Sequence, residues 1–223
     1  MGENVRLTYQ GLMSDEKITV VPGVVEDRQH VKVQPNRPAG DFLNVLYFSH
    51  MSKDKGVFVA FDAAALILQA NRKVMITFAG PIESEQVALK LEQLQKEHPG
   101  RVRYLGYIED ADERTAIYRG ADVFMFTTLR DVFGLVLLHA MAEGKPIVAS
   151  REGTIPEILV EGTTGFLCEK GNASLFAQRV IELLSDDALR IKMSAASRQR
   201  FEEVYQMKHF AKRMTDAFDH WRS

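Results

Sequence analysis

From residue 43 onward, short apolar segments alternate with longer segments whose apolar residues recur at helical spacing. The short segments, such as Leu43–Ser49, Val123–Thr127 and Pro146–Ala149, are apolar along most of their length rather than at every second position. Strands with that pattern are buried on both faces of a sheet. Strands that alternate with helices form βαβ units. The sequence therefore predicts an α/β fold, a Rossmann-like doubly wound parallel sheet with helices on both faces.

The other expected elements follow without an internal repeat or an internal linker. Further strands are predicted at Lys73–Ala79, Arg101–Leu105 and Gly165–Cys168. Helices are predicted at Gly56–Ala70, Ser84–Glu97, Asp112–Arg119, Gly134–Ala142, Ile155–Val160, Ala173–Leu184, Ala188–Tyr205 and Met207–Trp221.

The first 41 residues differ from the rest of the chain. They contain one expected strand, Ile18–Val21, followed by Pro22-Gly23 and a polar stretch with Pro35 and Pro38. Proline and glycine in polar surroundings indicate irregular chain. We therefore interpret residues 1–41 as a connector that enters a single domain formed by residues 42–223.

Composition excludes several classes of protein. The 223 residues suit one domain plus a short appendage, and a net charge of −2 gives no electrostatic reason to bind nucleic acid or an anionic membrane. The single cysteine, Cys168, rules out an internal disulfide and fits a reducing compartment. The start of the chain is polar, and no run approaches the roughly 20 apolar residues of a membrane span. We expect a cytoplasmic protein without a membrane span.

Several common site motifs are absent from the sequence. There is no G-x-x-x-x-G-K-[ST] and no G-x-G-x-x-G, which disfavours a P-loop kinase and an ordinary dinucleotide dehydrogenase. The six histidines are scattered and have no metal-ligand spacing with Cys168. We therefore predict neither a bound metal nor a cofactor.

The most informative segment follows the expected strand Val123–Thr127 and runs to Glu157. Ligands of doubly wound sheets bind beyond the carboxyl ends of the strands, which is where this segment lies. Asp131 is expected to cap the helix that begins near Gly134, and Gly134 lets a phosphate approach the N–H groups of the first turn. His139 follows eight residues after Asp131, or about 12 Å along a helix axis. One elongated ligand can touch both ends of that span.

A second loop with a cation follows the first strand and reads His50-Met51-Ser52-Lys53-Asp54-Lys55-Gly56. Lys55 stands where a helix begins. Its ammonium group is suited to neutralise a pyrophosphate and to stabilise a leaving nucleoside diphosphate as charge develops.

These two loops, in this order, resemble glycosyltransferase family 4 (group 1), in its nucleotide-sugar-binding C-terminal domain. The matching motifs are H50-x4-K55-G56, D131-V-F-G-L-V-L-L-H139, A-M-A-E-G-K-P-I-V-A-S, E-G-T-I-P-E157 and T-G-F-L. The similarity covers about residues 17–205, and Lys17–Pro22 resembles the segment by which such enzymes enter that domain. The resemblance implies the C-terminal half of a GT-B fold, with the N-terminal domain missing.

The resemblance also implies roles for single residues. Asp131 and Lys55 take the catalytic roles: Asp131 holds hydroxyls of the transferred sugar, and Lys55 binds the donor phosphates. His139 meets the ribose hydroxyls, and His50 stands where an arginine is usual. Backbone groups that contact the base, the sugar or the phosphates are implied at Ile108, Phe133, Gly134 and Leu135.

Besides His50, two positions depart from the family pattern. Asp131 replaces a glutamate and shortens the side chain by one methylene. His139 replaces a second glutamate, and an imidazole offers one acceptor and one donor where a carboxylate accepts from both ribose hydroxyls. A lost hydrogen bond of this kind costs on the order of 1–3 kcal/mol, which corresponds to about ten- to hundredfold in donor affinity.

The activity implied is transfer of a sugar, with retention, from a UDP-, GDP- or ADP-sugar to an acceptor hydroxyl, without a metal. The acceptor site belongs to the missing domain, so we expect no transferase activity from this chain alone. The apolar stripe of the last helix, from Met207 to Trp221, is expected to be partly exposed, docked on residues 1–40 or buried in a dimer.

Other interpretations remain open at this point. Taken singly, Asp131 is a helix cap, Lys55 a surface lysine and His139 a core histidine. The whole domain can be a degenerate, non-catalytic GT-B domain used for partner docking or regulation, which His50 and His139 favour. A sugar-nucleotide epimerase shares the fold, although the motifs fit a transferase better, and fold alone does not decide.

Overall fold

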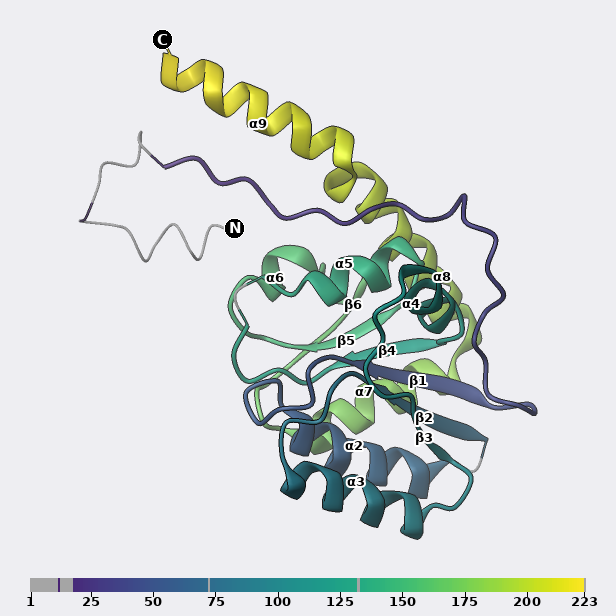
Figure 1. Ribbon diagram of the computed structural model, residues 1–223. Helices are drawn as coiled ribbons and strands as arrows, with labels where there is room; N and C mark the ends of the chain where they lie inside the picture. The colour runs from purple at the N-terminus through teal and green to yellow at the C-terminus, as the bar shows by residue number, and fades with distance from the viewer. Residues whose placement is uncertain (1–11, 13–17, 72, 132, 223) are drawn as a thin grey trace.

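The computed structural model describes residues 12, 18–71, 73–131 and 133–222. In the described part of the chain, six parallel strands form one sheet in the order β3-β2-β1-β4-β5-β6 (Figure 1). They are β1 (Leu43–Phe48), β2 (Val74–Ala79), β3 (Val102–Tyr104), β4 (Val123–Phe126), β5 (Ile147–Ser150) and β6 (Gly165–Cys168). This is the strand order of a Rossmann fold, in which the chain reverses its winding between β1 and β4. The predicted fold class is confirmed.

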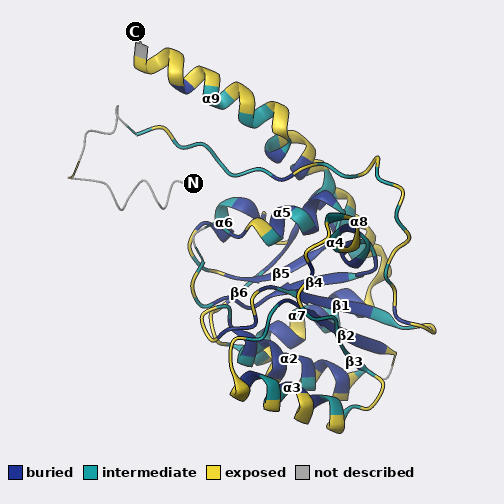
Figure 2. Ribbon diagram, viewed as in Figure 1, coloured by how far each residue is buried: buried dark blue, intermediate teal, exposed yellow. Residues whose placement is uncertain are grey.

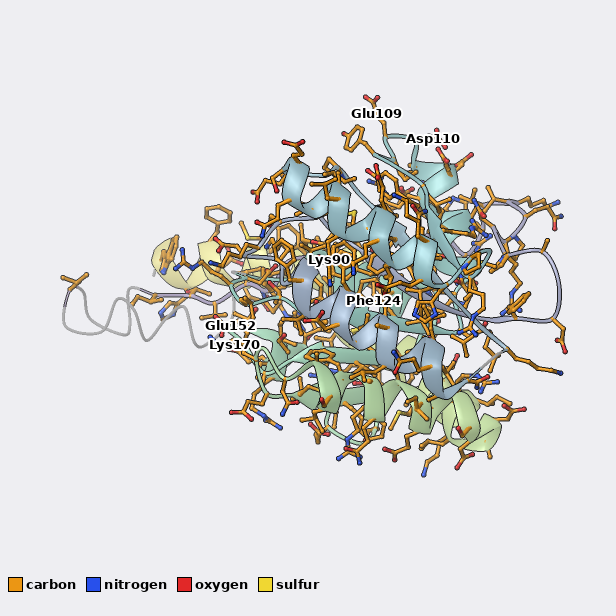
Figure 3. All side chains as sticks on the ribbon, turned by 90° about the horizontal axis from the view of Figure 1, so that it is seen from below. Lys90, Glu109, Asp110, Phe124, Glu152 and Lys170 are labelled. Carbon is orange, nitrogen blue, oxygen red and sulfur yellow. The ribbon has the colours of Figure 1, made fainter. Side chains whose placement is uncertain are left out.

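The strands form because their side chains are buried on both faces of the sheet. Every residue of β2, β4 and β5 is buried. Val45 of β1 lies opposite Ile76 of β2 on one side and Val123 of β4 on the other. Phe124 lies in the interior of the molecule (Figure 3). This arrangement explains why the strands are continuously apolar in sequence.

The helices cover both faces of the sheet. One face carries α2 (Val57–Ala70), α3 (Glu85–Glu97) and α7 (Ala173–Ser185), which share one apolar core. The other carries α4 (Ala111–Arg119), α5 (Leu135–Ala142) and the short α6 (Ile155–Ile158). α8 (Asp187–Arg200) follows α7 and packs against α5. Figure 2 shows the sheet buried and the outward sides of the helices exposed.

Two of the predicted secondary-structure elements were wrong. Ile18–Val21 is not a strand, because no described strand lies beside it to supply hydrogen bonds. The predicted helix Ala188–Tyr205 ends at Arg200 and continues as a π-helical segment, η2 (Phe201–Tyr205). Phe201 and Tyr205 of this segment, four residues apart, are both buried.

Residues 18–42 run along the outside of the domain without regular structure (Figure 1). Ion pairs attach this segment to the helices: Arg28 binds Asp112 at the start of α4, and Asp27 accepts from Arg198 of α8 at 2.7 Å. Residues 1–11 and 13–17 lie outside the described residues. β1 begins at Leu43, and the division of the chain into a connector, residues 1–41, and a domain, residues 42–223, stays a prediction.

The last helix, α9 (Met207–Arg222), projects away from the sheet (Figure 1). Phe210 and Met214 line one groove together with Thr19 and Val21, whereas Trp221 is 57% exposed. The apolar stripe is therefore partly exposed and borders one hollow with Thr19 and Val21, whereas its docking on the first residues and its burial in a dimer stay predictions. Among the described residues, no helix is long and apolar enough to cross a membrane.

Candidate functional site

The loops that follow β1 and β4 are joined by hydrogen bonds. The backbone N–H groups of Leu129 and Arg130 donate to the carbonyl oxygen of Asp54 at 2.9 and 3.0 Å. The Thr127 hydroxyl donates to the carbonyl oxygen of Gly56 at 2.8 Å. Gly56 has a φ of +68°, and a Cβ atom there would lie 1.8 Å from the Thr127 carbonyl oxygen. Only glycine fits this close approach, so the two loops keep a fixed relative position.

Lys55 and Asp131 meet where these loops join. The Lys55 ammonium nitrogen lies 2.6 Å from Asp131 Oδ2, and the side chains are 31% and 11% exposed. The Tyr47 hydroxyl donates to the Lys55 carbonyl oxygen at 3.0 Å and fixes the backbone beneath it. The structure thus brings together two residues that the sequence predicted for one site, and their roles in that site stay a prediction.

Asp131 also binds the backbone that follows it. Its Oδ1 accepts from the N–H groups of Phe133 at 2.9 Å and Gly134 at 2.6 Å. We expected Asp131 to cap α5, and this needs correction. Gly134, with a φ of +71°, is itself the residue before the helix, and the carboxylate holds the loop in front of it. The N–H groups of Leu135 and Val136 in the first turn have no hydrogen-bond partner recorded among the described residues.

Lys55, Asp131 and the α5 terminus border a cavity of about 520 Å³ at the carboxyl end of the sheet. The structure brings all the residues predicted for the site to its lining: His50, Lys55, Ile108, Asp131, Phe133, Gly134, Leu135 and His139.

Sequence reasoning missed several other lining residues, among them Tyr107, Arg114 and Tyr118. Arg114 and Tyr118 are four residues apart on α4 and so share one helical face. That spacing was visible in the sequence, but which face of α4 turns toward the cavity was not.

His139 lines the same cavity from α5, eight residues after Asp131. Its ring stacks on Tyr118, with the ring centroids 5.8 Å apart and the planes 26° from parallel. Burial lowers the pKa of His139 to about 4, and the positive charges of Arg114 and Arg28 act in the same direction. The imidazole is therefore neutral at pH 7 and keeps one acceptor nitrogen and one donor N–H.

The acids that follow Gly134 in sequence lie outside the cavity. Glu152 pairs with Lys170 at 2.5 Å and so ties the loop after β5 to the loop after β6 (Figure 3). Glu157 lines a separate hollow beside Arg200. Among the residues that the structure describes, no three His, Cys, Asp or Glu side chains are grouped to hold a metal ion.

The family model described as "Glycosyl transferases group 1" matches residues 28–200. The chain belongs to the group 1 glycosyltransferases. It is 30% identical over 164 residues to the N-acetyl-alpha-D-glucosaminyl L-malate synthase of Bacillus anthracis, covering 73% of this chain and 41% of that protein. The chain thus spans less than half the length of this family member.

Solved structures of GT-B glycosyltransferases share the fold. The sucrose-phosphate synthase of Thermosynechococcus elongatus matches with a TM-score of 0.79 and 21% identity, over 99% of this chain and 57% of the other. The Anabaena protein HepE, solved in complex with UDP and glucose, matches with a TM-score of 0.70 and 22% identity, over 80% of this chain and 48% of the other.

Proposed function

We propose that this group 1 glycosyltransferase chain binds a nucleoside-diphosphate sugar in the 520 Å³ cavity, as the donor-binding part of a retaining enzyme. The observation that carries the proposal is the set of groups around the Asp131 carboxylate. One ammonium group and two backbone N–H groups, from Lys55, Phe133 and Gly134, converge on it within 2.9 Å. Groups arranged to hold a carboxylate are also suited to hold a phosphate.

The diphosphate of the donor takes this end of the cavity. Lys55 neutralises it, and the N–H groups in the first turn of α5 point toward it with the positive end of the helix dipole. Both stabilise the charge that develops on the leaving nucleoside diphosphate. The proposed reaction therefore takes its positive charge from the chain itself and requires no metal ion.

The other lining residues hold the rest of the donor. Asp131 accepts from hydroxyls of the transferred sugar, and the backbone near Ile108 contacts the base. His50, exposed in the loop after β1, lies where it can donate to a phosphate oxygen. The acceptor hydroxyl comes from outside this cavity, so we propose that the chain alone does not transfer sugar.

The test is calorimetric titration of the chain with UDP, GDP and ADP. We expect one of them to bind saturably and Lys55→Ala to lose that binding. Lys53→Ala is the matched control, because Lys53 is an exposed lysine in the same loop that does not line the cavity. If no nucleotide binds at millimolar concentration, or if both alanine variants behave alike, the proposal is wrong.

One observation favours a second candidate, a non-catalytic domain that binds a partner. His139 replaces a carboxylate and is neutral at pH 7, so it accepts from only one ribose hydroxyl. If this end of the cavity has lost its function, His139→Glu raises nucleotide affinity strongly. If the chain works with histidine, the same change lowers affinity or leaves it as it was.

A further inference from the structure

The end of the cavity around His139 contains a cation that no sequence motif marked. Arg114 lies in the first turn of α4, which begins after the Asp110 cap, where Asp110 Oδ1 accepts from the Glu113 N–H at 2.7 Å. The Arg114 side chain is half-buried and lines both the main cavity and a narrow hollow behind it, and His139 lines the same two spaces. The two side chains therefore border the same two spaces, Arg114 from α4 and His139 from α5.

The guanidinium group of Arg114 makes no recorded hydrogen bond or ion pair with any described residue. Arg28, the other arginine at this end, is fully engaged: it binds Glu26 at 2.7 Å, the Thr115 hydroxyl at 3.0 Å and Asp112. The charge of Arg28 is thus balanced within the chain, whereas that of Arg114 is directed at the cavity.

The ring of His139 likewise has no recorded hydrogen-bond partner among the described residues, and Tyr118 holds it in place by stacking. A neutral imidazole accepts one proton and donates one. A guanidinium group only donates. A vicinal diol has two hydroxyl groups that each donate once and accept, so an acceptor and a donor side by side complement it.

We propose that Arg114 is a donor-binding residue that holds the ribose together with His139. This inference rests on the proposed nucleotide site. The His139 ring accepts from one ribose hydroxyl, and the Arg114 guanidinium donates to the oxygen of the other. The two side chains thus bind both ribose hydroxyls, one as acceptor and one as donor. A single carboxylate binds both by accepting a hydrogen bond from each. The ligand is a nucleoside diphosphate with both ribose hydroxyls free.

This assignment changes what His139→Glu tests. A carboxylate at position 139 would line the same two spaces as the Arg114 guanidinium group, and we expect the two to form an ion pair in place of the hydrogen bond from the ribose. We expect His139→Glu alone to lower nucleotide affinity or leave it unchanged. In an Arg114→Leu background, where that competing partner is gone, the same substitution raises affinity.

The experiment titrates the full chain with the nucleoside diphosphate that it binds best, with the 2′,3′-dideoxy form of that nucleotide and with inorganic pyrophosphate. We expect Arg114→Leu to weaken the ribonucleotide about tenfold, the effect of losing one hydrogen bond to a charged group. The dideoxy nucleotide and pyrophosphate bind equally to wild type and variant. Arg130→Leu is the matched control, because Arg130 is an 81% exposed arginine near the other end of the cavity.

Each result of these titrations supports or contradicts the ribose assignment. If Arg114→Leu weakens the ribonucleotide and the dideoxy form equally, Arg114 contacts the base or the phosphates and the ribose assignment is wrong. If Arg114→Leu changes neither, the residue has no part in binding. If a ribonucleotide with an added 3′-phosphate binds more tightly than the free diol, this end is an anion site, which also overturns the inference. If wild type binds no nucleotide, the proposed function itself fails, and that is seen before any variant is made.

Discussion

The Asp131 carboxylate uses the same groups that a diphosphate would need, and this gives a prediction about Asp131→Asn. The asparagine oxygen still accepts from the Phe133 and Gly134 N–H groups, so the loop keeps its shape. The ion pair with Lys55, at 2.6 Å and with both partners partly buried, is lost. Nucleoside diphosphates should therefore bind more tightly to the variant than to the wild type.

The size of the gain follows from the pair that is removed. Exposed ion pairs contribute about 0.2–1 kcal/mol, and hydrogen bonds to charged groups about 1.5–3 kcal/mol. With side chains 31% and 11% exposed, the Lys55–Asp131 pair lies between these limits. Freeing Lys55 then contributes about 1–2 kcal/mol to diphosphate binding, which is roughly five- to thirtyfold in Kd.

The assay is calorimetric titration with the nucleoside diphosphate and, separately, with its sugar conjugate. The conjugate should gain less, because the variant also loses the carboxylate that accepts from sugar hydroxyls. Asp54→Asn controls for the general loss of a negative charge near the cavity, since the Asp54 side chain pairs only loosely with Arg130, at 3.9 Å. Equal or weaker diphosphate binding by Asp131→Asn would refute the reasoning and show that the carboxylate prepares Lys55 for the ligand.

Three further predictions concern stability. Gly56→Ala should lower the free energy of unfolding by at least about 3 kcal/mol, because its Cβ would lie 1.8 Å from a carbonyl oxygen. Gly100→Ala, with a similar φ of +72° but nothing within 4 Å, should lower it by only about 1–2 kcal/mol. Equal losses for the two variants in urea unfolding would exclude the close approach as the cause. As pH falls from 7 to 5, His139 becomes protonated in the unfolded chain, where its pKa is near 6.5, but stays neutral in the folded chain, where its pKa is about 4. Between pH 7 and pH 5 the free energy of unfolding of the wild type should therefore fall by about 2 kcal/mol more than that of His139→Gln. Parallel dependence of the two unfolding free energies on pH would contradict this. Ser197→Ala should leave stability unchanged or raise it by up to about 1 kcal/mol, because the hydroxyl is buried with no hydrogen-bond partner in the described structure; a clear drop in melting temperature would reveal an unseen partner.

The sequence was sufficient for the fold and for the proximity of Lys55 and Asp131, because both depend on the order of buried strands. Continuous apolar segments predicted the parallel sheet, and the loops after β1 and β4 had to meet at its carboxyl edge. Lys55 and Asp131 were expected there for that reason. The hydrogen bonds of the Asp131 carboxylate were not predicted. The sequence does not show that this shorter side chain turns back and accepts from the Phe133 and Gly134 N–H groups.

The remaining differences have physical causes of the same kind. Arg114 was missed because its spacing to Tyr118 defines a helical face but not the direction in which that face points. The π-helical turn at the end of α8 was missed because the spacing of Phe201 and Tyr205, four residues apart, fits an α-helix equally well. The apolar run Ile18–Val21 looked like a strand by composition, but a strand also needs a neighbour with free backbone groups.

Lys55 and Asp131 are 76 residues apart in the chain, yet they follow β1 and β4, the two adjacent strands at the centre of the sheet. Each of these strands has a hydrogen-bonded neighbour on both sides, whereas β3 and β6 form the edges. Amide hydrogens of central strands are usually the last to exchange with solvent, because they are released only when the whole domain opens. The Lys55–Asp131 geometry should therefore survive fraying of either edge. A ligand held there protects the molecule against global unfolding and leaves hydrogen exchange at β3 and β6 almost unchanged.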